Sequence, residues 1–351
     1  MWRLNNRTPF AAERGWVRDR DGAEIWLVAL KCTFDIQPDG SLAVAGDQPP
    51  VTRTPESYGE PGQSSLKLES DLVLTKPTTD ILVSGHAYAP GGEPAEQADV
   101  GFRIGSVQKM LRVFGDRVWE GGSPSLPHPF LKIPLVYERA FGGRDARSPT
   151  PERDWEWRNP VGTGFALSRE SVQGTRVANI EYPGELIRSW RDRPKPAGFG
   201  PIAGHWQPRA SFAGTYDEQW MKDRQPLLPR DFDERFFQVA PLDQQPPTFL
   251  RGGEPVLLLH LTPSGDLRFR LPRVFPGFET RFFDGSRVRH TDRKLHSVIL
   301  EPDFPRVSLV WVSALRCHFK VHKLDQTIVS LKQDVRSREG SVDERETAEP
   351  A

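Results

Sequence analysis

The sequence predicts a mainly β protein whose antiparallel sheets form a sandwich-like body with few short helices, and an arrangement in two lobes is the alternative. Three observations favour this fold class. β-Prone runs alternate with turn residues along both ends of the chain. The 33 prolines and 30 glycines suit strands that are joined by ordered loops. Stretches with the apolar spacing of a helix are few and short.

The first part of the chain contains the clearest strand signals. Residues 24–36 form a β-prone run that ends at Pro38-Asp39-Gly40, and a short strand over 41–45 follows, which predicts a hairpin. A further strand is predicted over 80–88. Residues 98–104 and 107–114 flank Gly105-Ser106, a pair that fits a two-residue hairpin turn because glycine supplies a positive φ.

Strands of the same kind return in the last third of the chain, and helices are rare throughout. Leu186, Ile187 and Trp190 share one face of a predicted helical segment over 184–191, and Asp217 is predicted to cap a turn of helix through Trp220 and Met221. The predicted strands are 255–261, 267–271, 280–283, 287–289, 295–300, 307–312 and 315–321.

These elements predict one β-rich body over residues 1–330, with a loop-rich centre at 115–250. With 351 residues and 37% apolar residues, including ten tryptophans and 20 phenylalanines, the chain can bury a substantial core. The tail at 333–351 is charged and nearly free of large apolar residues, so it is predicted to be disordered.

Charge and cysteine content restrict the partners and the compartment. The 47 basic and 47 acidic residues cancel, which argues against a nucleic-acid-binding protein because such proteins concentrate basic charge. The two cysteines, Cys32 and Cys317, lie in apolar runs and are predicted to be buried free thiols. No signal-like N-terminus and no membrane-spanning run is visible. We therefore expect a cytoplasmic protein without a membrane partner.

The sequence offers little support for a metal site, a cofactor or a serine nucleophile. His318 and His322 are four residues apart, but their surroundings resemble a strand and lack a third ligand. The glycine-flanked serine of a nucleophile elbow and the phosphate-binding loop of nucleotide-binding proteins are both missing. We expect no metal, no cofactor and no catalytic residue, and consider a small-molecule ligand unlikely on the same grounds.

A carbohydrate-active protein is the alternative function. Trp155 and Trp157 stand among acidic residues, and paired carboxylates beside aromatic rings are typical of sugar-binding clefts and glycoside hydrolases. Arginines alternate with the same carboxylates, which favours a solvated loop with ion pairs instead. The acidic residues are Asp145, Glu152, Asp154 and Glu156.

Two phrases in the loop-rich centre predict structural ion pairs. Asp116 and Arg117 precede Trp119, and Glu138 and Arg139 precede Phe141-Gly142-Gly143. An arginine beside a carboxylate and an aromatic ring commonly locks the end of a strand, either stacked on the ring or forked onto the acid.

Aromatic residues in the stiff loops are the candidate partner contacts. Phe165 follows Asn159-Pro160-Val161-Gly162, and Phe199 lies between Gly198 and Gly200. Loops ordered in advance by proline and glycine lose little entropy on docking, and exposed aromatic residues are favoured interface anchors. The rival interpretation is that these rings plug the loops into the core. The predicted contacts are Trp155, Trp157, Phe165, Phe199 and Trp206.

Taken in order, these phrases resemble a bacterial family of uncharacterised domains whose genes lie in type VI secretion clusters. The resemblance extends from about Pro9 to about Arg316. It includes 65–71, Lys76-Pro77-Thr78-Thr79-Asp80-Ile81-Leu82-Val83, Gly85-His86-Ala87, Gly115-Asp116-Arg117-Val118-Trp119, 138–143, 159–165, Asn179-Ile180-Glu181, Gly214-Thr215-Tyr216-Asp217 with Trp220, Pro226-Leu227-Leu228-Pro229 and Asp231-Phe232-Asp233.

The resemblance implies a non-enzymatic adaptor or chaperone. Such a protein would hold a toxic effector, or its PAAR-like domain, in the cytoplasm and help to load it onto the secretion spike. The family has no accepted catalytic residues, so none is transferred to this chain. Some family members carry further repeat segments after the common domain, where this chain has a short polar tail, so contacts made through such segments are not expected here.

Overall fold

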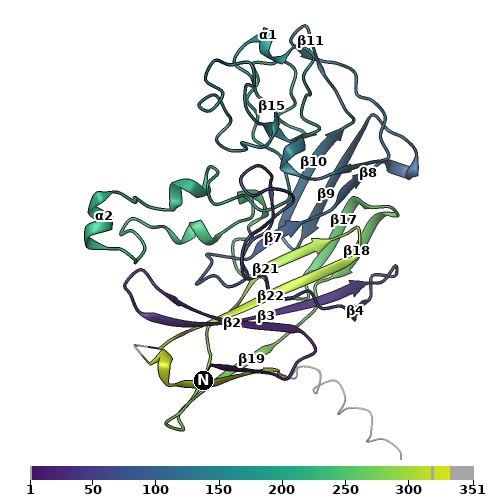
Figure 1. The fold of residues 1–351 in the computed structure, drawn as a ribbon. Helices are drawn as coiled ribbons and strands as arrows, with labels where there is room; N and C mark the ends of the chain where they lie inside the picture. Colours follow the sequence, from purple (N-terminus) through teal and green to yellow (C-terminus); the bar gives the residue numbers. More distant parts are fainter. Residues whose placement is uncertain (1, 318–319, 333–351) are drawn as a thin grey trace, which may run out of the picture.

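The computed structural model describes residues 2–317 and 320–332, and it is mainly β, as predicted. Three sheets of four, five and six strands form the body, and most of their strand pairs are antiparallel. Among the described residues, α-helix is limited to α1 (Arg169–Val172) and α2 (Glu218–Asp223). Figure 1 shows the strands below a lobe of loops, with α2 on a projection to one side.

The six-stranded sheet is built on β3 (Glu24–Ile36), the longest strand. The predicted hairpin is confirmed, because β3 pairs antiparallel with the short strand β4. β21 and β7 are the parallel pair of this sheet. In order, its strands are β2 (Ala11–Arg18), β3, β22 (Arg306–Arg316), β21 (Arg293–Glu301) and β7 (Asp80–Val83), with β4 (Leu42–Val44) beside β3.

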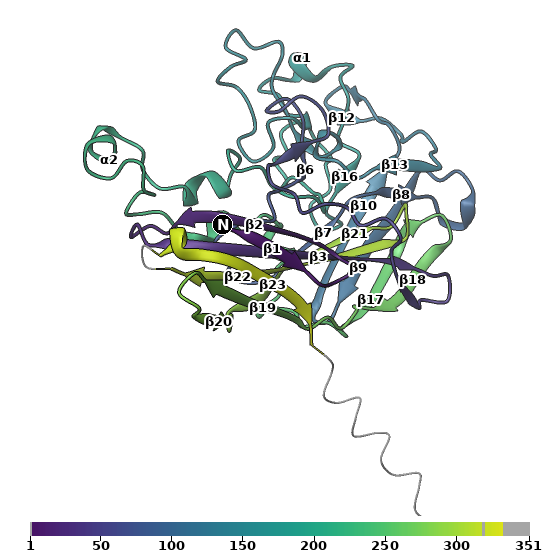
Figure 2. The ribbon, with the colours of Figure 1, turned by 60° about the horizontal axis from the view of Figure 1, so that its bottom comes forward.

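The other two large sheets pack against this one (Figure 2). The five-stranded sheet contains the predicted hairpins β9–β10 and β17–β18. Its order is β16 (Ile180–Glu181), β10 (Val107–Phe114), β9 (Gln97–Ile104), β17 (Pro255–Thr262) and β18 (Gly265–Arg270). The four-stranded sheet has the order β1 (Arg3–Asn6), β23 (Leu324–Leu331), β19 (Pro276–Phe282) and β20 (Arg287–Arg289).

Small ladders and single turns of 3₁₀ helix complete the structure. The ladders are β5 (Glu56–Ser57) with β6 (Leu66–Leu68), β8 (His86–Tyr88) with β13 (Lys132–Pro134), β11 (Trp119–Glu120) with β12 (Ser123–Pro124), and β14 (Phe141–Gly142) with β15 (Thr163–Gly164). The 3₁₀ turns are η1 (Pro90–Gly92), η2 (Tyr137–Arg139), η3 (Arg209–Phe212), η4 (Glu234–Phe237), η5 (Leu242–Gln244) and η6 (Val321–Lys323).

The alternation of side chains along β3 gives the molecule a core on each side of the six-stranded sheet. Trp26 and Leu30 belong to the main core, which also receives Phe102 of the five-stranded sheet and Val329 of the four-stranded sheet. Ala29 points the other way, into a second cluster that includes Val239. Both faces are therefore covered, which explains the nearly continuous apolar sequence of this strand.

Three predicted elements differ from the structure. The predicted strand 80–88 is two strands, β7 and β8, which belong to different sheets. The predicted strand 315–321 is wrong, because β22 ends at Arg316 and η6 begins at Val321. The predicted helix over 184–191 is also wrong. Ile187 and Trp190 pack into the loop lobe instead, and the Ile187 backbone N–H donates to the Glu181 carboxylate at 2.7 Å.

Other expectations are confirmed in the described residues. Asp217 caps α2, since its carboxylate accepts a hydrogen bond of 2.8 Å from the Trp220 backbone N–H. Cys32 and Cys317 are buried free thiols. The sequence did not lead us to predict β1, β2 or β23. His318 and the tail at 333–351, with its predicted disorder, lie outside the described residues.

The loop-rich centre has a small core of its own. Trp119, Phe141 and Val177 are buried in the loop lobe, with Phe165 and Trp190 packed against them. This cluster holds irregular backbone in place where no extended sheet is available. No helix within the described ranges combines the length and the apolar character that crossing a membrane would require.

Candidate functional site

An apolar groove of about 960 Å³ lies among the loops of the centre. We call it the proline groove, because rings of proline and tyrosine and one exposed leucine account for much of its wall. Leu242 is 84% exposed, so an apolar side chain stands in solvent at the groove. The residues that carry this apolar wall are Tyr137, Tyr182, Pro183, Pro196, Ile202, Pro208, Pro241 and Leu242.

The floor of the proline groove rests on the main core. The Tyr137 ring meets Trp206 edge-on, with centroids 5.6 Å apart, and the Tyr137 hydroxyl donates to the Gly200 carbonyl at 3.2 Å. Trp206 in turn donates from its indole nitrogen to Nε2 of His205 at 3.0 Å. The floor is therefore a rigid layer of rings with most of its polar atoms paired.

A buried lysine lies beneath the same groove. Lys109 of β10 donates from Nζ to the Gly198 carbonyl (2.6 Å), to Asp243 Oδ1 (2.9 Å) and to Gln244 Oε1 (2.8 Å). Its Nζ is also 5.2 Å from the centre of the Tyr182 ring. Burial lowers the pKa of Lys109 to about 8, although the neighbouring Asp243 carboxylate acts in the opposite direction.

The remaining ionisable groups of the groove each have a partner. The Tyr182 hydroxyl donates to the second oxygen of Asp243 at 3.0 Å, and burial followed by the Asp243 charge raises the pKa of Tyr182. Arg158 forks onto Glu156 with contacts of 2.8 and 2.7 Å. Lys195 and Glu185 are 3.2 Å apart. What the groove offers to a partner is therefore mainly apolar surface.

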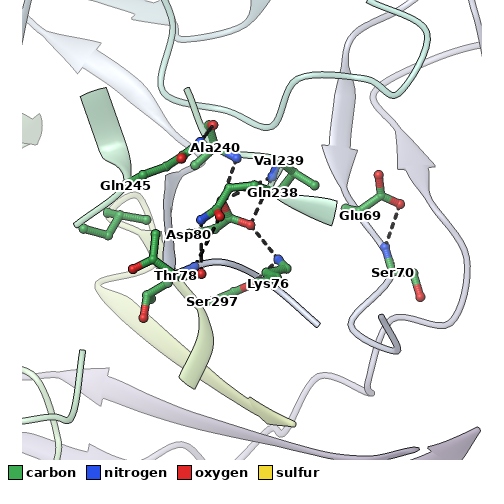
Figure 3. Close-up of polar contacts among 12 residues, drawn as sticks. Glu69, Ser70, Lys76, Thr78, Asp80, Gln238, Val239, Ala240, Gln245 and Ser297 are labelled. Carbon is green, nitrogen blue, oxygen red and sulfur yellow. Dashed lines mark hydrogen bonds and ion pairs between the residues drawn. The ribbon is translucent and has the colours of Figure 1, made fainter. Parts of the chain in front are cut away.

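The chain that leads into the groove is anchored by a buried carboxylate (Figure 3). Asp80, which is fully buried at the start of β7, accepts hydrogen bonds from the backbone N–H groups of Val239 and Ala240. It also pairs with Lys76 at 2.6 Å, and Lys76 donates to the Ser297 hydroxyl. The motif Lys76–Asp80 thus fixes the segment immediately before Pro241 and Leu242.

Two of the five predicted partner contacts are core residues, which corrects their proposed role. Phe199 is 0% exposed and Trp206 is 1% exposed. Trp206 packs under Tyr137 and Phe199 packs against Phe102 in the main core, so a partner on the surface cannot reach either ring. For these two residues the rival interpretation, rings that plug loops into the core, is the one that fits.

The other three predicted contacts lie in the loop lobe. The rings of Trp155 and Trp157 contact each other at 4.5 Å between centroids with a tilt of 37°, and Trp157 is 57% exposed. The Trp157 carbonyl accepts a hydrogen bond of 3.0 Å from Gln207, which lines the proline groove, so this tryptophan stands beside it. Phe165 is half-buried and packs edge-on against Phe141.

The predicted structural ion pairs exist, but the partners are exchanged. Arg117 is buried and pairs with Glu181, and its guanidinium lies 4.0 Å from the centre of the Phe114 ring, not over Trp119. Asp116 pairs with Arg139 at 3.1 Å, which joins the two sequence phrases to each other.

Glu138 was expected to form an ion pair with Arg139, but it binds Ser65 instead. Its carboxylate accepts from the Ser65 backbone N–H at 2.7 Å and from the Ser65 hydroxyl at 2.6 Å. Trp119 is buried in the loop lobe. The phrase from Glu138 to Gly143 therefore connects the N-terminal loops to the lobe.

Gly142 and Gly143 are required by close backbone contacts. Gly143 has a φ of +89°, and a Cβ atom at this position would overlap the Gly162 carbonyl. At Gly142 the same addition would overlap the Asn159 carbonyl. Only glycine allows the two chain segments of the lobe to approach so closely.

Two of the acidic residues near Trp155 accept hydrogen bonds that close loops. Asp145 accepts from the backbone N–H groups of Arg147 and Leu167, at 3.0 and 2.9 Å. Asp154 accepts from the hydroxyls of Ser148 and Thr150. The pKa of Asp154 is lowered by these two hydrogen bonds.

A histidine and an aspartate meet on another surface. His86 Nδ1 is 2.6 Å from Asp303 Oδ2, and the Tyr88 hydroxyl donates to the other oxygen at 2.9 Å. The nearby Ser84 hydroxyl bonds to Tyr58 at 2.8 Å. Among residues 2–317 and 320–332, no group of three or more His, Cys, Asp or Glu side chains is placed to hold a metal ion.

Most residues of the proline groove were not predicted from the sequence. Tyr182-Pro183-Gly184 and Pro241-Leu242-Asp243 are phrases of the same proline-rich kind as those that were selected, so composition could have identified them. It could not show that loops so far apart in the sequence meet at one place.

Taken together, the fold and the groove define a mainly β body with irregular loops that present an apolar concave surface. The chain belongs to a family described as an uncharacterized protein conserved in bacteria (DUF2169), whose model matches residues 21–312. Neither the curated proteins nor the solved structures contain a significant match to this chain.

Proposed function

We propose that this chain is a non-enzymatic adaptor or chaperone, which binds a type VI secretion effector or its PAAR-like domain and helps to load it onto the secretion spike. Its partners on this proposal are the effector toxin and the PAAR-type and spike tip proteins. The observation that carries the binding role is the proline groove, where Leu242 and proline rings face solvent while the ionisable groups are paired with one another.

The physical properties of the groove suit a protein partner. Proline-stiffened loops are held from below by Lys109 and Trp206, so little conformational entropy is lost when a partner docks. An apolar concavity with a paired polar margin resembles the centre of a protein interface, where desolvation contributes most of the affinity. Masking an apolar segment of the cargo until the spike assembles is the mechanism that we propose.

The link to type VI secretion depends on the order of the sequence phrases. Several of these phrases have structural roles here: Lys76–Asp80 anchors the chain before the groove, and Asp116 joins Arg139 across the loop lobe. They build the scaffold that shapes the groove. The resemblance therefore concerns the residues that hold the loops in place. The identity of the cargo has to come from experiment.

The test compares two leucines of equal exposure. Leu242 at the proline groove is 84% exposed and Leu126, which does not line it, is 85% exposed. Purified wild type, Leu242→Asp and Leu126→Asp are each used to capture the effector and tip proteins encoded beside the gene, and affinities are measured by calorimetry. We expect Leu242→Asp to weaken capture by about tenfold or more, since a charge would be buried in the interface.

Leu126→Asp should bind as the wild type does, and both variants should keep the wild-type melting temperature because each site is in solvent. Equal affinity of all three proteins for the cargo would remove the groove from the proposal. Failure of the wild type to capture any effector or tip protein would remove the proposed function itself.

A glycan-binding role is favoured by one specific observation, the contacting pair Trp155 and Trp157 with its exposed indole. Aromatic faces of this kind can stack on sugar rings. The purified protein should be screened against glycans and peptidoglycan, with Trp157→Ala as the matched variant. Binding or turnover that depends on Trp157, without capture of an effector, would support this carbohydrate-active alternative in place of the adaptor.

A further inference from the structure

A second surface, on the opposite face of the five-stranded sheet, carries a row of arginines. In the register of the sheet, Arg103 of β9 lies opposite Leu257 of β17, which lies opposite Arg268 of β18. Directly opposed residues share one face of a sheet, and neighbours along a strand point to opposite faces. Lys109 is opposite Phe102, so the lysine beneath the proline groove is on the other face from Arg103.

This face is hollowed into a groove of about 630 Å³, which we call the arginine groove. One wall is the tip of the β3–β4 hairpin, with Asp39, Gly40 and Leu42, and the other is the surface of β9, β17 and β18. It shares no lining residue with the proline groove. Apolar atoms of Leu42, Leu257 and Pro272 lie between the charged groups.

The positive charge of the arginine groove is largely uncompensated within the described chain. Arg103 is exposed and forms no ion pair with any described residue. Arg268 reaches Asp266 only at 3.8 Å. Arg270 donates to the Gly253 carbonyl at 3.0 Å, which leaves its charge free. The only acidic side chain that lines the groove, among the described residues, is Asp39, and its carboxylate is turned to the Ser41 backbone N–H at 2.9 Å.

Further arginines extend this patch at its end. Arg273 lies against Gly253, where an added Cβ would come within 2.6 Å of Arg273 Nε. Arg251 stands beside the same pair of glycines and is exposed. Glu254 stands at this end as well, and its carboxylate accepts from the Arg251 backbone N–H at 2.8 Å. The five arginines still outnumber Asp39, Glu254 and Asp266, so the surface has a local positive charge that attracts a partner of opposite charge.

We propose that the arginine groove binds an acidic, extended polypeptide segment of a partner protein. Arg268 and Arg270 are alternate residues of one strand, so their side chains are separated by about 7 Å, which is also the separation of alternate side chains in an extended peptide. Carboxylates at alternate positions of such a peptide can each meet one guanidinium. The intervening apolar side chains would cover Leu257 and Leu42.

A polypeptide fits this surface better than a nucleic acid does. The side chains between the arginines are aliphatic, and Phe269 is buried, so no exposed aromatic ring offers a base a stacking surface. β18 is the last strand in the order of its sheet, but Gly40 at the tip of the β3–β4 hairpin packs directly against its backbone at Arg268. The peptide would therefore lie across the arginine side chains on the face of the sheet, and would not add a strand beside β18. This proposal stands independently of the adaptor function, since it rests on a different face of the molecule.

The test uses a fluorescent peptide in which glutamate alternates with valine, and a second peptide in which glutamine replaces each glutamate. Anisotropy titrations compare the full-length wild type with Arg268→Glu/Arg270→Glu. The matched control is Arg287→Glu/Arg289→Glu, which changes two exposed alternate arginines on β20, a strand at the end of the four-stranded sheet. Both double variants change the net charge equally.

We expect the glutamate peptide to bind the wild type, with an affinity that falls as salt is added. The β18 variant should lose about tenfold or more in affinity and the β20 control about twofold or less. Arg103→Gln removes one charge from a neighbouring strand without reversing it, and it should also weaken binding. This milder variant tests the groove even if the double variant has a folding defect.

Four results would overturn the proposal. They are equal losses in the β18 and β20 variants, equal binding of the glutamine peptide, preferential binding of a single-stranded oligonucleotide of equal charge, and self-association of the wild type that Arg268→Glu/Arg270→Glu abolishes. The last would assign this face to a second copy of the chain. A failure here leaves capture at the proline groove untouched, so the two proposals are tested separately.

Discussion

Lys109 Nζ and Asp243 Oδ1 lie 2.9 Å apart beneath the proline groove, and this contact joins a strand of the five-stranded sheet to the loops above it. The same ammonium group bonds to the Gly198 carbonyl and to Gln244. One buried cation therefore positions two chain segments that are far apart in the sequence. The shape of the proline groove depends on it.

Replacing this cation should loosen both loops. In Lys109→Met the three acceptors lose their donor, and Asp243 is left with the Tyr182 hydroxyl alone. We expect the free energy of unfolding at pH 7 to fall by about 2 kcal/mol, because the buried acceptors of Gly198 and Gln244 lose their donor while Asp243 is partly exposed to water. Urea denaturation measures this change, and a variant as stable as the wild type would contradict the structural role.

The same variant should change how stability depends on pH. Burial lowers the pKa of Lys109 to about 8 from its ordinary value of 10.5, so the folded state binds fewer protons than the unfolded state between these values. Stability contributed by this group therefore rises with pH across that window. The free energy of unfolding of the wild type should rise relative to that of Lys109→Met from pH 8 to 10. The steepness of this rise should correspond to a difference of up to about one bound proton between the unfolded and folded states. Parallel pH curves for the two proteins would show that Lys109 titrates normally.

Asp80 is expected to be the most sensitive carboxylate of the scaffold. In Asp80→Ala, Lys76 keeps its charge in a buried site and two backbone N–H groups lose their acceptor. The expected loss is about 3–5 kcal/mol in the free energy of unfolding. The control is Asp325→Ala, which breaks an ion pair of 2.8 Å with the exposed Arg3 and should cost about 1 kcal/mol or less. Similar losses in both variants would mean that burial does not decide the cost.

Substitutions at two glycines distinguish the cost of backbone strain from the cost of steric overlap. Gly143 and Gly174 both have positive φ, +89° and +76°, but an added Cβ overlaps the Gly162 carbonyl only at Gly143 and meets nothing within 4 Å at Gly174. Gly174→Ala should therefore cost about 1 kcal/mol from strain alone. Gly143→Ala should cost at least about 2 kcal/mol more, because the lobe has to open. Thermal unfolding compares the two variants directly. Equal losses would mean that a Cβ atom at position 143 overlaps no neighbouring atom.

Local sequence patterns were sufficient for the hairpins but not for the rest of the fold. Gly105 between two β-prone runs specifies β9–β10, and Pro38-Asp39-Gly40 specifies β3–β4, because turn chemistry acts over a few residues. β23 was not predicted, and its partners β1 and β19 are contributed by distant parts of the chain. The apolar spacing around Ile187 suggested a helix, but the contacts of the loop lobe override this local preference.

For the candidate site, too, local sequence patterns were not sufficient. Proline and aromatic composition identified the correct region, and Trp157 stands beside the proline groove. The composition could not separate exposed rings from buried ones, since the sequence around Phe199 and Trp206 has the same character as that around Trp157. Whether a ring faces solvent is decided by which distant loop covers it, and no short-range pattern encodes that.

The difference between these rings gives a last prediction. Trp206 is 1% exposed and packs on Tyr137 in the floor of the proline groove, so Trp206→Ala leaves a large cavity. It should lower the free energy of unfolding by about 3–5 kcal/mol. Trp157 is 57% exposed, and Trp157→Ala should cost about 1 kcal/mol or less. Urea denaturation of the two variants under the same conditions makes the comparison.

The same pair of variants also separates a binding defect from a folding defect. If Trp157 contacts the partner, Trp157→Ala weakens capture while its unfolding curve stays close to that of the wild type. Trp206→Ala weakens capture only as far as it disturbs the floor, so its loss should be smaller at lower temperature and smaller in Trp206→Phe, which leaves less of the cavity empty. A Trp157→Ala protein that unfolds as easily as Trp206→Ala would show that the exposed indole supports the fold, and the surface beside the proline groove would then lose its candidate anchor.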